Sequence, residues 1–261
     1  ISFTDMHFGY TDYRFVGLEN YTRLLQWRHL PTVLRNTGVF VGAVVFLQMS
    51  FGLLIAMLLN RKVPGRALAR SVAIFPWILP AIVIGLMFKQ MFVGSRLGIM
   101  NALRSSMGLQ TVSWLTNPSL AMAIMIGSVT WRGTALSIIL QLGGLQTIPD
   151  EVNEAAVIDG AHSLQRLWYI TLPLLRPSLL INLIMATSGT FNHVDIPLSL
   201  TGGGPRRATE VLSLALYKQA FEMLDASLAA TIATVILVIN LILTLVYLKI
   251  LDPGSTGLSD Q

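Results

Sequence analysis

Long stretches without a charged side chain constrain the fold of this chain more than any other feature. No Lys, Arg, Asp or Glu occurs between Asn36 and Leu59. At about 1.5 Å of rise per residue, a helix of this length crosses a hydrocarbon core of about 30 Å. The stretch therefore predicts a transmembrane helix.

Four further windows have comparable length and few charges. Together the five windows predict an all-α, multi-pass membrane protein, with a single transmembrane domain over residues 1–261. No strand pattern and no internal repeat competes with this interpretation. The further windows are Ser71–Phe88, interrupted by Pro76 and Pro80; Ser119–Leu142, which contains Arg132; Ser178–Leu200, which contains Asp195; and Ser227–Tyr247, which Lys249 closes.

Composition agrees with a membrane protein and excludes several other classes. The chain is 53% hydrophobic and only 12% charged, whereas soluble domains carry about a quarter charged residues. It has no Cys, which excludes disulfides, thiolate metal sites and cysteine nucleophiles. Its four His residues lack the spacing of metal ligands, so no metal is expected. The pI near 9.8 comes from scattered bases that form no stripe, so we expect no nucleic acid partner.

The residues before and after the first window give information on topology. The opening residues ISFTDMHF have no initiator Met, no basic segment and no apolar segment, so they are not a signal peptide. They look like a chain cut after an earlier segment, and we expect one helix to precede them. Beyond the window, four bases in residues 61–70 favour a cytoplasmic loop there, although Lys and Arg elsewhere give only a weak indication.

The segment EAAVIDGAHSLQRLWYITLP, residues 154–173, is unusually polar for this chain. A first short helix is predicted from Pro149, because Pro and acids suit the first turn, and Asp159-Gly160 is predicted to break it. A second helix should run from Ser163 to Pro173, with Leu164, Leu167 and Trp168 on one face. Such a hairpin is either a docking surface or an amphipathic loop lying on lipid, and the residues alone leave both open.

The same segment resembles the EAA loop of binding-protein-dependent ABC importer permeases. The matching residues keep the spacing of that family, with Leu167 where the family more often has Phe; they are Glu154-Ala155-Ala156, Asp159-Gly160-Ala161, Ile170 and Leu172-Pro173. Four further stretches resemble the maltose-type carbohydrate permease subfamily: FVGLENYTRLL, LGIMNAL at 97–103, GGLQTIPDEVNEAA at 143–156, and Phe191–Phe221 with LTGGGP at 200–205. A preceding helix ends in a sequence like SFTD in that family, which implies six helices with one absent here.

The resemblance implies a helical bundle of the type I ABC importer kind and a set of partners. Residues 146–177 would form the cytoplasmic coupling loop, which sits in a groove of an ATPase subunit and is pushed when two ATPases close. The implied partners are a second homologous permease subunit, two cytoplasmic ATPase subunits that bind ATP and Mg, and an extracytoplasmic solute-binding protein. The implied location is the cytoplasmic membrane of a bacterium or archaeon. The implied ATPase-coupling residues are Glu154, Ala155, Ala156, Asp159, Gly160 and Ala161.

The implied substrate is a sugar or a sugar-like solute. A glycerol-phosphate-type substrate and an ATP-independent channel are the alternatives. The chain itself is not expected to be an enzyme or to hold a cofactor, because Gly-x-x-x-x-Gly-Lys-Ser/Thr and Gly-x-Ser-x-Gly are both absent. Gly202-Gly203-Gly204 has no Lys-Ser after it, so we expect a flexible outer loop there.

Ionisable residues inside the predicted spans are the candidates for the substrate path. On the fourth span these are Asn192, His193 and Asp195. Pro197 has no N–H, so it frees the carbonyl of His193, and a carboxylate, an amide and a free carbonyl suit sugar hydroxyls. Counted from Ser178, Asp195 lies roughly 25 Å along the span, so a position at the outer interface is the alternative.

Arg132, on the third span, is the other candidate for the substrate path. Its predicted depth differs too much from that of Asp195 for an ion pair between them. A helix terminus, a neighbouring subunit and the substrate are the remaining partners for its side chain.

Overall fold

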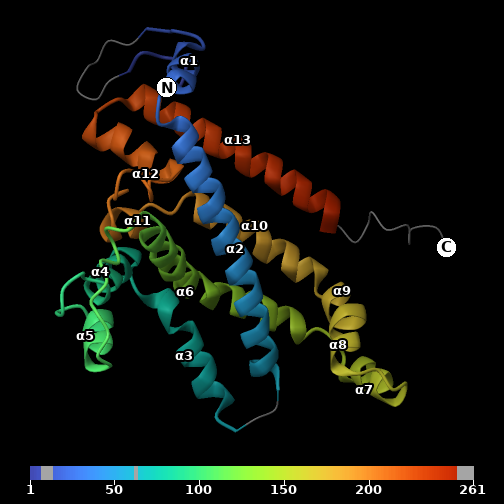
Figure 1. The fold of residues 1–261 in the computed structure, drawn as a ribbon. Coiled ribbons are helices and arrows are strands. Elements are labelled where there is room, and N and C mark those ends of the chain that lie inside the picture. The colour runs from blue at the N-terminus through green and yellow to red at the C-terminus, as the bar shows by residue number, and fades with distance from the viewer. Residues whose placement is uncertain (7–13, 62–63, 252–261) are drawn as a thin grey trace. The chain divides into compact units, whose positions relative to one another are not determined.

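The computed structural model describes residues 1–6, 14–61 and 64–251 (Figure 1). Helices account for most of these residues. Within the described ranges, β-pairing is limited to an isolated bridge between Thr4 and Phe15. The prediction of an all-α fold is therefore confirmed.

The chain forms two compact units. The first unit comprises Ile1–Val44, Leu79–Val129 and Gly189–Leu241. The described residues of the second lie within Val45–Ile78, Thr130–Ser188 and Ile242–Gln261. Four helices, α2, α6, α10 and α13, contribute residues to both units.

Three helices of the described chain are long and apolar enough to cross a membrane. They are α2 (Leu30–Asn60), α6 (Pro118–Leu145) and α13 (Ala226–Leu251). Each extends beyond the uncharged window that predicted it. The side chain of Asn117 accepts hydrogen bonds from the N–H groups of Ser119 and Leu120 at the start of α6. The first, third and fifth windows are thus confirmed as long helices.

The second window is divided between α3 (Arg66–Ile78) and α4 (Ala81–Met91). Pro76 lies buried inside α3 and does not interrupt it, contrary to the prediction. The interruption is at Leu79-Pro80, because a residue before proline disfavours the α conformation. α3 and α4 are long and apolar enough for a membrane segment only as a pair, bent by 95° at the break, as in a broken span or a re-entrant loop.

The fourth window, predicted as one candidate span from Ser178 to Leu200, is divided between two helices. α10 (Arg176–Phe191) ends before Asn192, and α11 (Asp195–Leu200) begins after Val194. Pro197 cannot donate to the carbonyl of His193, and that carbonyl instead accepts a hydrogen bond of 2.9 Å from the hydroxyl of Ser213. The depth of Asp195 counted from Ser178 therefore does not hold.

Apart from the helices within residues 150–174, three short helices of the described chain lie outside the predicted windows. They are α1 (Glu19–Gln26), α5 (Ile99–Ser106) and α12 (Leu212–Tyr217), which continues into the π-helical segment η2 (Lys218–Glu222). Buried asparagines hold two of them by hydrogen bonds, Asn20 in α1 and Asn101 in α5. Asn101 of α5 donates to the carbonyls of Val93 and Val112 and accepts from the N–H of Val112 and the indole of Trp114. Hydrogen bonds of this kind join a helix to residues outside it, so the spacing of apolar residues along the sequence does not predict them.

The core of the second unit brings the end of α6 close to the start of α10. Its buried residues are Ala56, Leu59, Ile138, Leu142, Leu145 and Leu175. Gly144 permits the close approach, because a Cβ there would lie 2.7 Å from the Cβ of Ser178 and 2.9 Å from Cδ2 of Leu175. The segment between α6 and α10 therefore leaves and rejoins the core at one place.

Candidate functional site

The segment between α6 and α10 forms a helical hairpin, defined here as residues 150–174 (Figure 1). It consists of α7 (Asp150–Ile158), α8 (Ser163–Arg166), the π-helical segment η1 (Leu167–Thr171) and α9 (Leu172–Leu174). The predicted break at Asp159-Gly160 is confirmed. Pro149 is the N-cap of α7 rather than its first helical residue.

The turn of the hairpin is built around Gly160. Its φ is +79°, a left-handed conformation that glycine adopts at little cost. The N–H of Gly160 donates to the carbonyl of Val157, and that of Ala161 donates to the carbonyl of Ala156, which closes the end of α7. A Cβ at Gly160 would meet no atom within 4 Å, so the requirement for glycine inside the chain is conformational.

The return arm of the hairpin starts with a reciprocal cap and ends later than predicted. The N–H of His162 donates to the side chain of Gln165, and the N–H of Gln165 donates to Nδ1 of His162. Pro173 does not end the arm, which continues to Leu174. The π-helical segment η1 directly precedes α9, which contains Pro173. Proline has no N–H to donate to the preceding turn, and the hydrogen bonds of η1 skip one more residue than those of an α-helix.

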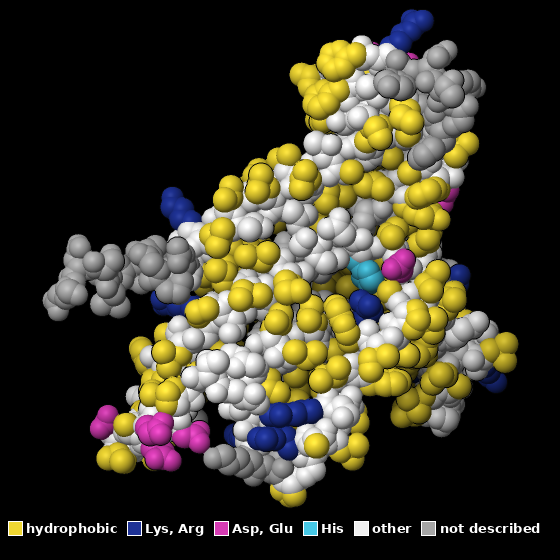
Figure 2. All heavy atoms as spheres, turned by 180° about the vertical axis from the view of Figure 1, so that it is seen from behind, with side chains coloured by type: hydrophobic (Ala, Val, Ile, Leu, Met, Phe, Trp, Pro, Cys, Tyr) yellow, Lys and Arg dark blue, Asp and Glu magenta, His cyan; other side chains and the backbone are white. Residues whose placement is uncertain are grey.

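The surface of the hairpin combines acidic and apolar side chains. Of the residues implied in ATPase coupling, Glu154, Ala155, Asp159 and Gly160 are exposed, Ala161 is half-buried and Ala156 is buried. Figure 2 shows acidic side chains gathered at the lower left, and the acids of α7 include Asp150, Glu151 and Glu154. Large apolar side chains are exposed as well: Ile158 is 85% exposed, Tyr169 80% and Trp168 64%.

Asn192, His193 and Asp195 lie in or directly after the break between α10 and α11. Asn192 and Asp195 are exposed and His193 is half-buried. Asp195 is the first residue of α11, where the helix dipole favours a carboxylate. The carbonyl of His193 is not left without a donor, because Ser213 occupies it. Ser213 lies on a distant helix, so nothing in the local sequence pointed to it.

Arg132 belongs to the second unit and contacts an aromatic ring. Its guanidinium lies 4.7 Å from the ring centroid of Trp77, in a cation–π arrangement. Its Nε is buried and has no hydrogen-bond partner in the described part of the chain. Asp195 belongs to the first unit. Trp77 is the partner of Arg132 that sequence reasoning missed.

The segment Thr201–Val211, called here the glycine loop, is held by hydrogen bonds along its length. The hydroxyls of Thr201 and Thr209 are 2.7 Å apart, and the hydroxyl of Thr209 also donates to the carbonyl of Gly204. Lys218 donates to the carbonyl of Gly202. The expectation of a flexible outer loop did not foresee these hydrogen bonds, which join residues 5 to 16 positions apart in the chain.

The second half of the glycine loop carries an ion pair. Arg207 donates to both carboxylate oxygens of Glu210 at 3.0 Å, and Glu210 is only 1% exposed. Asn36 of α2 donates to the backbone carbonyls of Arg207 and Glu210. Arg207 is thereby fixed in a left-handed conformation with φ of +63°.

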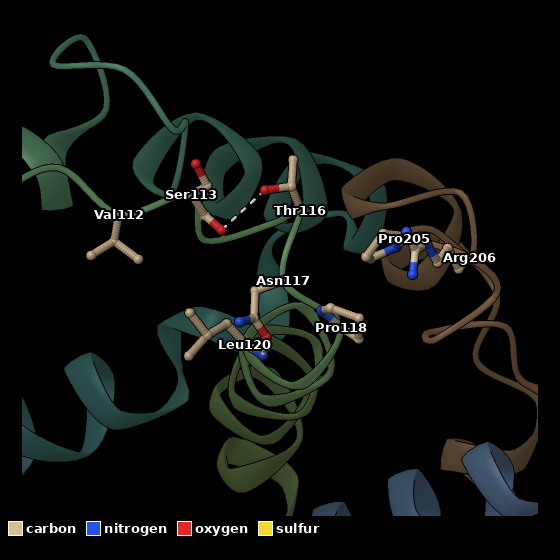
Figure 3. Close-up of a pocket in the computed structure, with 8 residues that line it drawn as sticks. All are labelled: Val112, Ser113, Thr116, Asn117, Pro118, Leu120, Pro205 and Arg206. Atoms are coloured by element: carbon tan, nitrogen blue, oxygen red, sulfur yellow. Dashed lines mark hydrogen bonds between the residues drawn. The ribbon is translucent and has the colours of Figure 1, made fainter.

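A cavity of about 490 Å³ lies beside this loop. Figure 3 shows Pro205 and Arg206 on one side of it and the segment from Val112 to Leu120 on the other. Two of its polar side chains are engaged within the chain, since Thr116 donates to the carbonyl of Ser113 and Asn117 caps α6. The described residues contain no cluster of His, Asp and Glu suited to a metal ion.

An all-α fold with three helices of membrane length and an exposed helical hairpin defines a multi-pass helical membrane protein. The chain belongs to the family of binding-protein-dependent transport system inner membrane components, whose model matches residues 48–256. The resemblance drawn from the EAA loop is thus confirmed.

Three curated relatives cover most of the chain. The trehalose/maltose transport system permease protein MalF of Thermococcus litoralis is 36% identical over 236 residues, which are 90% of this chain and 79% of that protein. The multiple sugar-binding transport system permease protein MsmF of Streptococcus mutans is 35% identical over 92% of this chain and 82% of its own length. The sulfoquinovosyl glycerol transport system permease protein SmoG of Agrobacterium fabrum is 32% identical over 91% and 77%.

A solved structure has the same fold. It is a chain of a bacterial alginate ABC transporter, crystallised in complex with an alginate pentasaccharide-bound periplasmic protein. The TM-score is 0.81 at 20% identity, and the match covers 92% of this chain and 84% of that one. The helical bundle of the ABC importer kind is therefore established for this chain as a fold.

Proposed function

We propose that this chain is the membrane subunit of an ATP-driven importer. With a second permease subunit it forms the path for a sugar or sugar-like solute, which an extracytoplasmic binding protein delivers. Support comes from the family, which is described as binding-protein-dependent, and from relatives named for trehalose/maltose, multiple sugars and sulfoquinovosyl glycerol. These names do not favour a glycerol-phosphate-type substrate or an ATP-independent channel.

The hairpin, with its flanking residues 146–177, is proposed to dock on a cytoplasmic ATPase subunit. The single observation that carries this proposal is its exposed surface, where Ile158, Trp168 and Tyr169 accompany the acids Glu154 and Asp159. Exposed aromatic and aliphatic side chains beside charged ones are typical of a protein interface. The acids would pair with bases or backbone amides of the ATPase.

The anchoring of the hairpin suits the transmission of force. The two ends of the segment join helices whose contact at Gly144, Leu175 and Ser178 is too tight for an added methyl group. A push on the hairpin would therefore be passed to α6 and α10 and would not be absorbed by a soft linker. Closely packed elements transmit displacement because their interiors are nearly incompressible.

Two groups of side chains are proposed for the substrate path, one in each unit. In the first unit, the exposed amide of Asn192 and carboxylate of Asp195 can bind sugar hydroxyls. In the second unit, the half-buried guanidinium of Arg132 lies beside the ring of Trp77. An aromatic ring with a nearby polar donor suits the apolar face and the hydroxyls of a sugar.

The proposal can be tested with proteoliposomes that contain this chain, the second permease, the ATPase and the binding protein. Uptake of labelled maltose and trehalose is expected only when ATP is present inside and every component is included. Uptake that persists without ATP would contradict the proposal and support a channel.

Docking can be tested in the same complex by oxidative cross-linking. The chain contains no native Cys, so Ala155→Cys provides a single reactive position on an exposed part of the hairpin. It is expected to cross-link to a cysteine placed in the groove of the ATPase. Ala102→Cys, exposed on α5, is the matched control; equal cross-linking from both positions would contradict docking through the hairpin.

A further inference from the structure

The second unit contains an open cavity of about 580 Å³ that the proposed function does not use. Its volume is in the range of sites that bind small molecules. Most of its lining is polar and comes from the end of α2, the start of α3, the segment after α6 and the start of α7. The polar lining includes Asn60, Arg66, Arg70, Gln146, Asp150 and Asn153.

Arg70 is an incompletely satisfied cation in this lining. Its Nε is buried and has no hydrogen-bond partner in the described part of the chain. One of its terminal nitrogens reaches the carbonyl of Leu59, at 3.4 Å. A buried donor without an acceptor costs free energy, so the site favours an occupant that supplies oxygen acceptors.

The charge of the lining indicates an anion. Arg66 and Arg70 are four residues apart on α3, so both guanidinium groups lie on one face. Asp150 is the acid among the lining residues, which leaves a net charge of +1. A phosphodiester carries a single negative charge, and its oxygens match the fork of a guanidinium.

A second, smaller cavity of about 240 Å³ shares Arg70 and Gln146 with the first. The rest of its lining is apolar, with Leu59, Ile74, Ile138, Ile139, Leu142 and Gly143. Arg70 therefore stands where a polar cavity meets an apolar one. A soluble phosphate would fill only the first cavity, whereas a phospholipid has a headgroup for the first and an acyl chain for the second.

We propose that the two cavities bind an anionic phospholipid, with its phosphodiester at Arg66 and Arg70 and one acyl chain along the apolar lining. Arg66 begins a helix that belongs to a bent candidate span, and basic residues at such ends meet lipid phosphates. The lipid would touch both the end of α6 and the start of α7. It would therefore stabilise the position of the hairpin relative to α6, whatever solute the importer carries.

The test is lipid retention by the intact importer complex, measured by native mass spectrometry. The complex is exchanged into bilayers of equal phosphatidylglycerol and phosphatidylcholine and then extracted in mild detergent. Selective retention of phosphatidylglycerol is expected. Arg70→Gln should lower this retention about tenfold, because a charge-assisted pair of hydrogen bonds is lost. Arg61→Gln is the matched control, since Arg61 is exposed and is not among the residues that line either cavity.

Each outcome decides the proposal. Equal retention of both lipids, or an equal loss in Arg61→Gln, would overturn it. Binding of inorganic phosphate to the delipidated complex with no retained phospholipid would also overturn it and would assign the polar cavity to a soluble anion. If Arg70→Gln does not assemble, Arg66→Gln provides the same comparison. Uptake is not the readout, so this result stands apart from the test of transport.

Discussion

The glycine loop and the hairpin both combine glycine, proline and charged residues, but their polar groups are used differently. In the loop, Glu210 is buried and paired with Arg207, and Asn36 binds the backbone of both residues. In the hairpin, Glu154 and Asp159 are exposed beside exposed apolar side chains. The loop satisfies its polar groups within the chain, whereas the hairpin presents them to its surroundings.

This difference indicates that the polar groups of the glycine loop stabilise the fold, whereas those of the hairpin are available to bind a partner. Groups that are bonded within the chain contribute to stability, and their removal should lower the free energy of unfolding. Exposed side chains contribute little to stability, and their removal should instead weaken binding to a partner. Variants in the two segments should therefore change different measured quantities.

The largest loss of stability is expected for Arg207→Ala in the glycine loop. The change leaves the carboxylate of Glu210 buried without its cation, and we expect the free energy of unfolding to fall by about 2–4 kcal/mol. Thermal unfolding of the purified protein measures this loss. Arg206→Ala is the matched control, because Arg206 is exposed and also has a positive φ. Equal losses in both variants would show that the ion pair is not the cause.

A smaller loss is expected for Asn36→Ala. The amide of Asn36 donates to the carbonyls of Arg207 and Glu210 at 2.8 and 3.2 Å, and two lost hydrogen bonds correspond to about 1–2 kcal/mol. The same thermal unfolding measurement applies. Arg35→Ala, at an exposed neighbouring position on α2, should leave the transition unchanged. An unchanged transition in Asn36→Ala would mean that α2 does not hold the loop.

The sequence was sufficient for features that depend on local patterns. The uncharged windows located α2, α6 and α13, and Asp159-Gly160 located the turn of the hairpin. Local patterns were not sufficient where distant residues decide the outcome. The end of α10 coincides with a hydrogen bond from Ser213 to His193, and the glycine loop accepts a hydrogen bond from Asn36, which lies far away in the chain.

Proline positions show the same limit. Pro80 follows a break, but Pro76 and Pro173 lie inside helical segments. Whether a helix tolerates proline depends on how the freed carbonyl is satisfied and how neighbouring turns adjust, as in η1 before Pro173. Among the candidate site residues, the spacing of the EAA loop identified the hairpin. It could not distinguish buried Ala156 from exposed Ala155.

In the hairpin, Gly160→Leu should combine a modest loss of stability with a loss of uptake. Leucine at a φ of +79° is strained by about 1–2 kcal/mol, and its bulk would project from the exposed turn. Uptake per assembled complex is expected to be abolished. Gly160→Asn is the control, because asparagine tolerates this conformation better. Normal transport by Gly160→Leu with the ATPase bound would contradict the coupling role.

Asp195 should show a functional effect with little change in stability, because its carboxylate is exposed. If it binds a sugar hydroxyl, Asp195→Ala should lower uptake by about tenfold, which corresponds to about 1.4 kcal/mol. Asp195→Asn should be milder because an amide oxygen still accepts a hydrogen bond. The measurement is uptake of labelled sugar, normalised to assembled complex. Near-normal uptake by Asp195→Ala would remove this residue from the substrate path.

The central claim, that the exposed surface of the hairpin serves a partner, is tested most directly by Ile158→Ser. Ile158 is 85% exposed, so the free energy of unfolding should change by less than about 0.5 kcal/mol. Binding of the ATPase should weaken at least about tenfold, as for an apolar anchor of an interface. Leu97→Ser is the matched control, because Leu97 is 93% exposed outside the hairpin. The measurement is the amount of ATPase that copurifies with each variant. The predicted result is that less ATPase copurifies with Ile158→Ser and an unchanged amount copurifies with Leu97→Ser. Equal amounts of copurified ATPase with both variants would contradict the claim.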